Sequence, residues 1–312
     1  GPTAVRKFSR RTAIALAGGA GALGLGCLAA SKLLKVPPFA TLALPYSATP
    51  SPIPKQDRAT AAVAQGVDID FVRVPAGQFI MGSVDGYQNE RPQLRLFLPE
   101  YWIGRTHVTV AQFSAFVMAT GYKTQAEKDG FSYALIALNW RKVVGANWAH
   151  PKGPDAATKG RDDHPVVHIS WDDAVAFCSW ASASAGLFIR LPTEPEWEKA
   201  ARGVDGRKYP WGDRASANDL LNFQYAVGAT TFVGKYSPDG DSPYGCVDMM
   251  GNARQWVSSL FKDYPYSATD RESLTDRGDR VLRGGGFDNY ANHVYAAFRD
   301  LRRPPDYYAE TS

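Results

Sequence analysis

The sequence predicts an α+β domain in which little of the chain forms regular helices or strands. Short alternating apolar runs indicate a few strands, and three apolar helical patterns each follow a Ser or Thr. Between these elements, glycine, proline and aromatic residues are scattered without a period. The 312 residues include 29 Gly, 21 Pro and 8 Trp, and 45% are apolar. This apolar content suits a sizeable core and is too high for a disordered chain.

Three short strands are predicted near the start of the domain. Residues 71–74 and 78–82 are apolar-rich runs that flank a Pro-Ala-Gly turn at 75–77. Residues 94–98 alternate in polarity, which is typical of a strand with one buried face.

Three helices are predicted from their capping residues. Thr109, Ser170 and Thr193 precede helical patterns over 109–120, 170–181 and 194–201. Gln112 lies three residues after Thr109 and completes a capping box, and acidic residues in the first turns after Ser170 and Thr193 favour the helix dipole. These residues fix where each helix begins.

The positive charge of the chain belongs to its N-terminal segment. The formal net charge is +4, from 35 basic and 31 acidic residues. Residues 1–35 hold six basic residues and no acidic one, so the remainder has 29 basic against 31 acidic residues. Nucleic-acid binding needs clustered basic residues on the folded domain. We therefore expect no nucleic-acid partner.

Residues 1–35 are predicted to be a twin-arginine-type export signal. Arg10 and Arg11 precede an uncharged, Gly-rich stretch over 12–30. We expect passage through the Tat translocase to the periplasm, with membrane contact only through an uncleaved signal. Two alternatives stay open, a lipoprotein at Cys27 and a buried N-terminal helix. Residues 36–67, with six prolines, are predicted to be a linker, and 68–312 the folded domain.

The cysteines do not form a disulfide framework. Cys27 lies in the predicted signal, which leaves Cys178 and Cys246. They either form one bridge or are two separate buried thiols, and free cysteine is usually buried.

A series of strings resembles the formylglycine-generating enzyme (sulfatase-modifying factor) family. They run in order over most of the domain, at residues 79–83, 101–103, 108–113, 145–154, 164–171, 190–203, 209–212, 250–256 and 283–287. The resemblance implies a C-type-lectin-like formylglycine-generating-enzyme fold with little regular secondary structure. We interpret five tryptophans in or near these strings as core anchors: Trp171, Trp180, Trp197, Trp211 and Trp256. Glu194 and Glu198 are interpreted as capping and ion-pairing residues.

The copper site of that family is not expected here. In the family, two cysteines after an Arg-Gly-Gly-Ser motif bind copper, because soft sulfur ligands hold Cu(I). Here Gly286 replaces the serine, and Asn289 and Val294 stand where the cysteines are expected. Formylglycine generation by that mechanism is therefore excluded. Whether another redox metal binds stays open.

The same segment supplies the candidate catalytic residues Asp288, Asn289 and His293. A histidine near an aspartate can act as a general base. The alternative is turn chemistry, which Asn and Asp commonly serve.

The resemblance also implies structural Ca²⁺, held by side-chain and backbone oxygens in two loops. One loop would use Asn222, Phe223 and Val227. The other would use Asp248, Gly251, Ala253 and Gln255, the last replacing the usual glutamate.

Two classes of function remain. The export signal, the family domain and the missing cysteines resemble the members that mature the siderophore pyoverdine. They predict a periplasmic maturation factor or oxidoreductase acting on a peptide or peptide-siderophore precursor. The alternative is a non-catalytic binding protein, such as an accessory protein of a nitrite reductase. The polar residues near the lost cysteines favour the first class.

Overall fold

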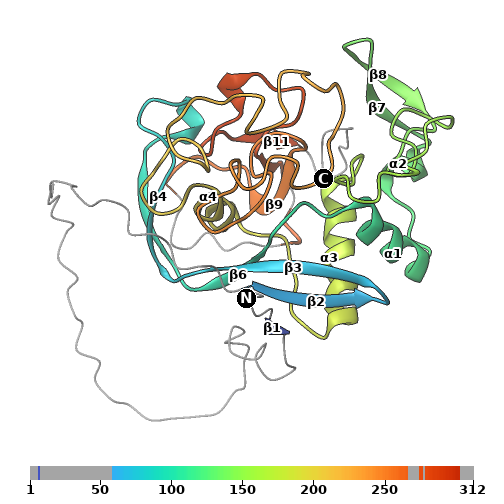
Figure 1. Cartoon of the computed structure of the whole chain (residues 1–312), viewed down its shortest axis with the longest axis horizontal. Coiled ribbons are helices and arrows are strands. Elements are labelled where there is room, and N and C mark those ends of the chain that lie inside the picture. Colours follow the sequence, from blue (N-terminus) through green and yellow to red (C-terminus); the bar gives the residue numbers. More distant parts are fainter. Residues whose placement is uncertain (1–5, 8–57, 266–273, 277, 303–312) are drawn as a thin grey trace, which may run out of the picture.

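The computed structural model describes residues 6–7, 58–265, 274–276 and 278–302 (Figure 1). The Arg10-Arg11 pair, the uncharged segment and most of the predicted linker lie outside these residues. Within them, no helix is long and apolar enough to cross a membrane.

A sheet with the order β1-β2-β3-β6 forms one side of the domain. It contains β1 (Arg6–Lys7), β2 (Arg58–Ala64), β3 (Val67–Val74) and β6 (Tyr101–Gly104). β2 lies inside the range 36–67 that we predicted as linker, so this boundary needs correction. The prolines end at Pro54, and alternate residues of β2, beginning with Ala59, are buried, which makes a strand with one core face. The boundary between the predicted linker and the folded domain therefore lies no later than Arg58.

The predicted helices are confirmed, and each begins after the predicted cap. Complete capping boxes start α1 (Val110–Thr120), α3 (Trp171–Ala185) and α4 (Glu194–Arg202). α3 runs past the predicted end because Gly186, at φ 64°, supplies the left-handed C-cap. A further short helix, α2 (Gln125–Asp129), has a capping box of its own.

The remaining strands form a small sheet and two hairpins. β9 (Gln255–Leu260), β10 (Arg280–Arg283) and β11 (Asp300–Arg302) form an antiparallel sheet in the order β11-β10-β9. The hairpins pair β4 (Gly77–Met81) with β5 (Leu94–Leu98), and β7 (Phe131–Ile136) with β8 (Asn139–Val144). In Figure 1, the β7–β8 hairpin lies at one end with α1 and α2, and β4 lies at the other. The predicted strand 71–74 lies within β3, 78–82 overlaps β4, and 94–98 coincides with β5.

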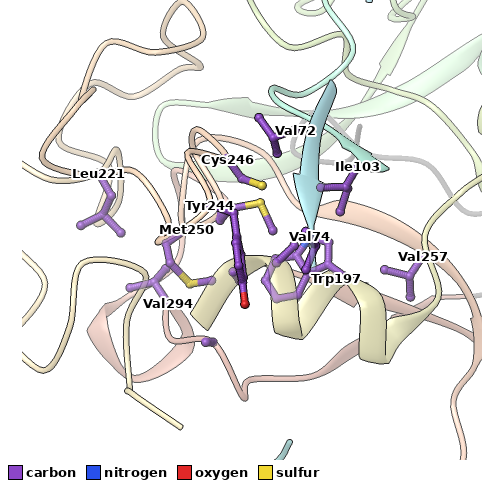
Figure 2. Close-up of a cluster of buried hydrophobic side chains, with 14 of the residues drawn as sticks. Val72, Val74, Ile103, Trp197, Leu221, Tyr244, Cys246, Met250, Val257 and Val294 are labelled. Carbon is purple, nitrogen blue, oxygen red and sulfur yellow. The ribbon is translucent and has the colours of Figure 1, made fainter. Parts of the chain in front are cut away.

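The core is built around α4 and the predicted tryptophans. Trp197 of α4 packs with Val72 and Val74 of β3 and with Tyr244 and Cys246 (Figure 2). Trp171 and Trp256 are also buried, and their indole N–H groups donate to main-chain carbonyls. Trp180 and Trp211 are half-buried. Both described cysteines are free thiols.

Two buried carboxylates of α4 carry the main ion-pair network. Glu194 pairs with Arg299, with Nε–Oε1 at 2.7 Å, and Glu198 pairs with Arg202 at 2.9 Å. Arg283 of β10 contacts both glutamates. All five side chains are buried, which they tolerate only because each charge is paired and hydrogen-bonded. The ion-pairing role predicted for Glu194 and Glu198 is thus confirmed.

His168 joins the β7–β8 hairpin to the body of the domain. Its Nδ1 lies 2.6 Å from Ser132 Oγ, and its Nε2 lies 2.9 Å from the carbonyl oxygen of Pro151. A carbonyl only accepts hydrogen bonds, so Nε2 carries the proton and Nδ1 accepts from Ser132. Burial lowers the pKa of His168 to about 4, and the imidazole is therefore neutral in the folded protein at neutral pH.

We predict that the domain loses stability as the pH falls from 6.5 towards 4, in part through His168. The unfolded histidine binds a proton near pH 6.5 and the folded one near pH 4, so acid favours unfolding in this interval. The contribution is on the order of 3 kcal/mol at its fullest. Urea denaturation of the native protein and of His168→Gln at pH 7 and pH 4.5 measures it. The variant should lose this part of the pH dependence, and an unchanged pH dependence would contradict the assignment.

Candidate functional site

A groove of about 970 Å³ lies between the loop that joins β4 to β5 and the residues before and after β10. The loop lines it with residues from 83 to 93, and Asp263 and Tyr264 form another part of its wall. His293, Phe298 and Arg299 line it from the C-terminal segment.

The ion-pair network holds the loop wall of this groove in place. Arg202 Nη1 donates to the carbonyl of Gly82 at 2.9 Å, and Gly82 N donates to Glu198 Oε1 at 2.7 Å. Arg299 Nη1 donates to the carbonyl of Asn89 at 2.6 Å. The start and the middle of the loop are therefore tied to buried charges of the core.

His293 is the predicted candidate that the structure places in the groove. It ends a short 3-10 helix, η3 (Ala291–His293), and its Nε2 lies 3.3 Å from Tyr87 Oη. Its ring stacks on Tyr87 and packs against Phe298, with ring centroids 6.0 and 4.8 Å away. Asn292 Nδ2 lies 3.4 Å from both Tyr87 Oη and His293 Nε2. His293, Tyr87 and Asn292 form a polar trio that can bind a polar group of a ligand and transfer a proton to or from it.

Glu90 lies behind the loop wall, and sequence reasoning missed both this residue and Tyr87. Tyr295 Oη donates to Glu90 Oε1 at 2.6 Å, and burial raises the pKa of Glu90. Its Oε2 is buried without a hydrogen-bond partner among the described residues. Tyr87 and His293 are 206 positions apart, so no local pattern could have joined them.

The structure places Asp288 and Asn289 outside the groove and gives both of them structural partners. Asp288 is 9% exposed and pairs with Arg254, at Oδ1–Nη1 and Oδ2–Nη2 distances of 3.1 and 3.3 Å. Asn289 Oδ1 accepts from the N–H of Gly286 at 2.8 Å and closes a turn. Asn289 therefore has the turn-forming role that was the alternative prediction, and Asp288 has a structural role in an ion pair.

The two positions where the cysteines were expected lie around one glycine. A Cβ atom on Gly285 would be 2.9 Å from Val294 Cγ1 and 3.2 Å from Asn289 Oδ1. It would also be 2.8 Å from the carbonyl oxygen of His293. Val294 is fully buried in the same apolar cluster as Cys246, whereas Cys178 packs against a different cluster, and both cysteines are free thiols. His293, which lines the groove, is therefore next to the expected copper position, where the side chains of Asn289 and Val294 now lie.

The domain matches the sequence model of the sulfatase-modifying factor enzyme 1-like domain over residues 57–309. The chain belongs to this family. It is 34% identical over 261 residues to the formylglycine-generating enzyme of Bos taurus, covering 72% of this chain and 67% of that protein. The family resemblance predicted from the sequence is confirmed.

The chain is also similar to two other relatives in sequence and to one solved structure in fold. The chain is 32% identical to the inactive Cα-formylglycine-generating enzyme 2 of Bos taurus, with 78% of this chain and 86% of that protein covered. It is also 32% identical to the hercynine oxygenase of Mycolicibacterium smegmatis, over 77% and 59% of the two chains. The structure of PvdO from Pseudomonas aeruginosa matches with a TM-score of 0.64 and 22% identity. That match covers 81% of this chain and 95% of PvdO, and it confirms the predicted fold.

The predicted calcium ligands around Asp248 are engaged with other protein groups. The carbonyl of Ala253 accepts from His107 Nε2 at 2.9 Å. Gln255 accepts from Trp197 Nε1 through Oε1 and donates to the Asp248 carbonyl through Nε2, at 2.8 and 3.2 Å. Asp248 Oδ2 accepts from Gly234 N, and Gly251 N donates to the Gly284 carbonyl. Several ligand oxygens of this loop thus already accept a hydrogen bond, and calcium at this loop stays a proposal.

The loop at Asn222 fits a cation better. Asn222 Oδ1 is buried with no hydrogen-bond partner in the described part of the chain, while Nδ2 donates to the Ala229 carbonyl. The Phe223 carbonyl accepts from Ala226 N and retains a second lone pair, whereas Val227 is 48% exposed. Across the described ranges, no group of three or more His, Cys, Asp or Glu side chains could hold a metal ion. Calcium, which binds amide and carbonyl oxygens, stays a proposal for this loop.

We predict that millimolar Ca²⁺ raises the melting temperature of the protein through Asn222. A ligand at 100 times its Kd adds about 2.7 kcal/mol to the free energy of unfolding. Asn222→Ala should abolish the difference between calcium and chelator, and Asp248→Asn should keep it. A difference that survives Asn222→Ala and disappears in Asp248→Asn would place the ion in the other loop. No difference in the native protein would exclude both sites.

Proposed function

We propose that this protein is an exported maturation factor that binds a peptide or peptide-siderophore precursor in the groove beside His293. It does not generate formylglycine, because Asn289 and Val294 supply no thiolate for copper. The observation that carries the proposal is the groove itself, with a polar trio of His293, Tyr87 and Asn292 next to the filled cysteine positions.

The lining of the groove suits an extended peptide. Its volume is in the upper range of small-ligand sites, and its amide side chains can pair with peptide N–H and C=O groups. Asn89 Oδ1, in the groove wall, is buried without a hydrogen-bond partner among the described residues. Tyr87 and Phe298 offer aromatic surface beside these polar groups. Arg91 and Arg299 place positive charges in the wall and Asp263 a negative one.

Within this groove, His293 acts as the proton-transfer group. Tyr87 Oη lies at hydrogen-bond distance from Nε2, so a proton can pass between the substrate and His293 directly or through this hydroxyl. The packing of the His293 ring on Tyr87 and Phe298 fixes its orientation. Maturation of pyoverdine in the periplasm is the specific role that we propose, from the twin-arginine segment combined with a family domain without the cysteine pair.

A second candidate function is binding without turnover. The observation that favours it is the structural use of Asp288 and Asn289, which leaves His293 as the single groove residue of the predicted catalytic set. The similarity to the inactive formylglycine-generating enzyme 2 points in the same direction. On this view the same groove would hold a peptide or a partner protein.

We predict that His293→Gln abolishes maturation, with at least a tenfold accumulation of immature precursor in the periplasm of the source strain. The substitution removes the titratable group and keeps the volume. Tyr290→Phe is the matched control, because Tyr290 lies on the same loop, is exposed and does not line the groove. Asp288→Asn is unsuitable as a functional probe, since it breaks the buried pair with Arg254.

Binding of the purified precursor is measured in parallel by titration calorimetry. Normal maturation by His293→Gln, at normal protein level and with retained binding, would favour the binding function. Failure of the native protein to bind the precursor would overturn the proposed substrate.

A further inference from the structure

A second cavity, distinct from the groove, lies inside the domain and has a volume of about 160 Å³. It is enclosed by β3, the segment between β6 and α1, both long helices α1 and α3, and residues 247–256. Its wall is mostly aliphatic and aromatic, with Phe113, Phe177 and Trp256 all buried. Arg105 and Arg190, which are partly or fully exposed, mark the part of the wall nearest to solvent.

His107 places one free acceptor in this apolar wall. The side chain is 6% exposed and lines the cavity. Its Nε2 faces the carbonyl oxygen of Ala253 at 2.9 Å, and because a carbonyl only accepts, Nε2 carries the proton. The Nδ1 atom of the neutral ring is then a lone-pair acceptor. No described residue donates to it.

Most other polar groups of the wall have partners, although Arg105 Nε, towards the solvent side, is buried without one among the described residues. The Gln255 amide bonds to Trp197 and to the Asp248 carbonyl, as described above. Arg190 forms an ion pair with Glu196. Burial raises the pKa of the Cys178 thiol to about 12, so this side chain contributes an uncharged S–H. A water molecule needs two to four polar partners to be well held. Among the described side chains of the wall, His107 Nδ1 is the unpartnered acceptor, and Arg105 Nε is an unpartnered donor on the side nearest to solvent.

We propose that this cavity binds a small, mostly apolar molecule with one hydrogen-bond donor, of about the size of phenol, whose O–H donates to His107 Nδ1. An apolar cavity of roughly 150 Å³ is large enough for a benzene ring. A buried acceptor without a partner costs roughly 1–3 kcal/mol, so the donor relieves a penalty that an apolar ring alone would leave. The His107 acceptor and the apolar wall together favour a small apolar ligand that carries one hydrogen-bond donor.

The test compares phenol with benzene on the full chain. Phenol should bind roughly five- to tenfold more tightly, which is the share of one net hydrogen bond. It should also shift the ¹⁵N resonance of His107 Nδ1, and benzene should shift it much less. Affinities are measured by NMR titration below the concentrations at which phenol denatures the protein.

Two variants identify the site. Ala174→Leu fills the cavity from α3, and it should abolish the binding of both molecules. His107→Phe removes the acceptor and keeps a ring, so it should leave benzene binding and abolish the preference for phenol. If His107→Phe does not fold, the ¹⁵N shift in the native protein still decides the donor contact. Equal affinities for the two ligands, binding that survives Ala174→Leu, or a cavity that takes only water would each overturn the proposal.

Discussion

The structure depends on a buried network of two carboxylates and three guanidinium groups centred on α4. Glu194 and Glu198 pair with Arg202, Arg283 and Arg299, which come from α4, from β10 and from the segment before β11. Removing one partner from such a cluster leaves a buried charge and costs about 3–5 kcal/mol. A fold with short strands and few helices therefore has a rigid centre that its regular secondary structure alone would not give.

The same network shapes the groove. Its guanidinium groups donate to the carbonyls of Gly82 and Asn89, and so the wall of the groove is attached to the core. This attachment involves neither Asn289 nor Val294. The groove wall is therefore held independently of the positions where the copper cysteines were expected. In the function that we propose, His293 and Tyr87 are the side chains that would act in this groove.

Local sequence patterns predicted the parts of the fold that local interactions determine. The caps Thr109, Ser170 and Thr193 identified the helix starts because a capping box depends on residues three positions apart. β2 was missed because its small apolar residues follow a Pro-rich stretch and form a strand only through pairing with β3. This pairing is a tight hairpin in which Ala64 lies opposite Val67, so Gly66 in the turn, at φ 70°, was a local signal that the prediction overlooked.

The candidate site shows the same division. Asp288, Asn289 and His293 lie within six positions in the sequence, but the fold turns Asp288 towards Arg254 and His293 towards Tyr87. The predicted calcium ligands at 248–255 show a related effect, since His107 and Trp197, distant in sequence, donate hydrogen bonds to the oxygens of Ala253 and Gln255. The ion-pairing role of Glu194 and Glu198 was predicted correctly, because buried carboxylates need partners, whereas the capping role belongs to Glu196.

Hydrogen exchange of the backbone amides tests the central role of the network most directly. In Glu198→Gln, the amides of Ser83 and Glu90, which are hydrogen-bonded within the groove loop, should exchange at least tenfold faster relative to those of α3. Glu100→Gln, which removes a partly exposed partner of Arg73, is the matched control and should leave both regions unchanged. Unchanged protection of the loop in Glu198→Gln, or an equal loss in α3, would contradict the account.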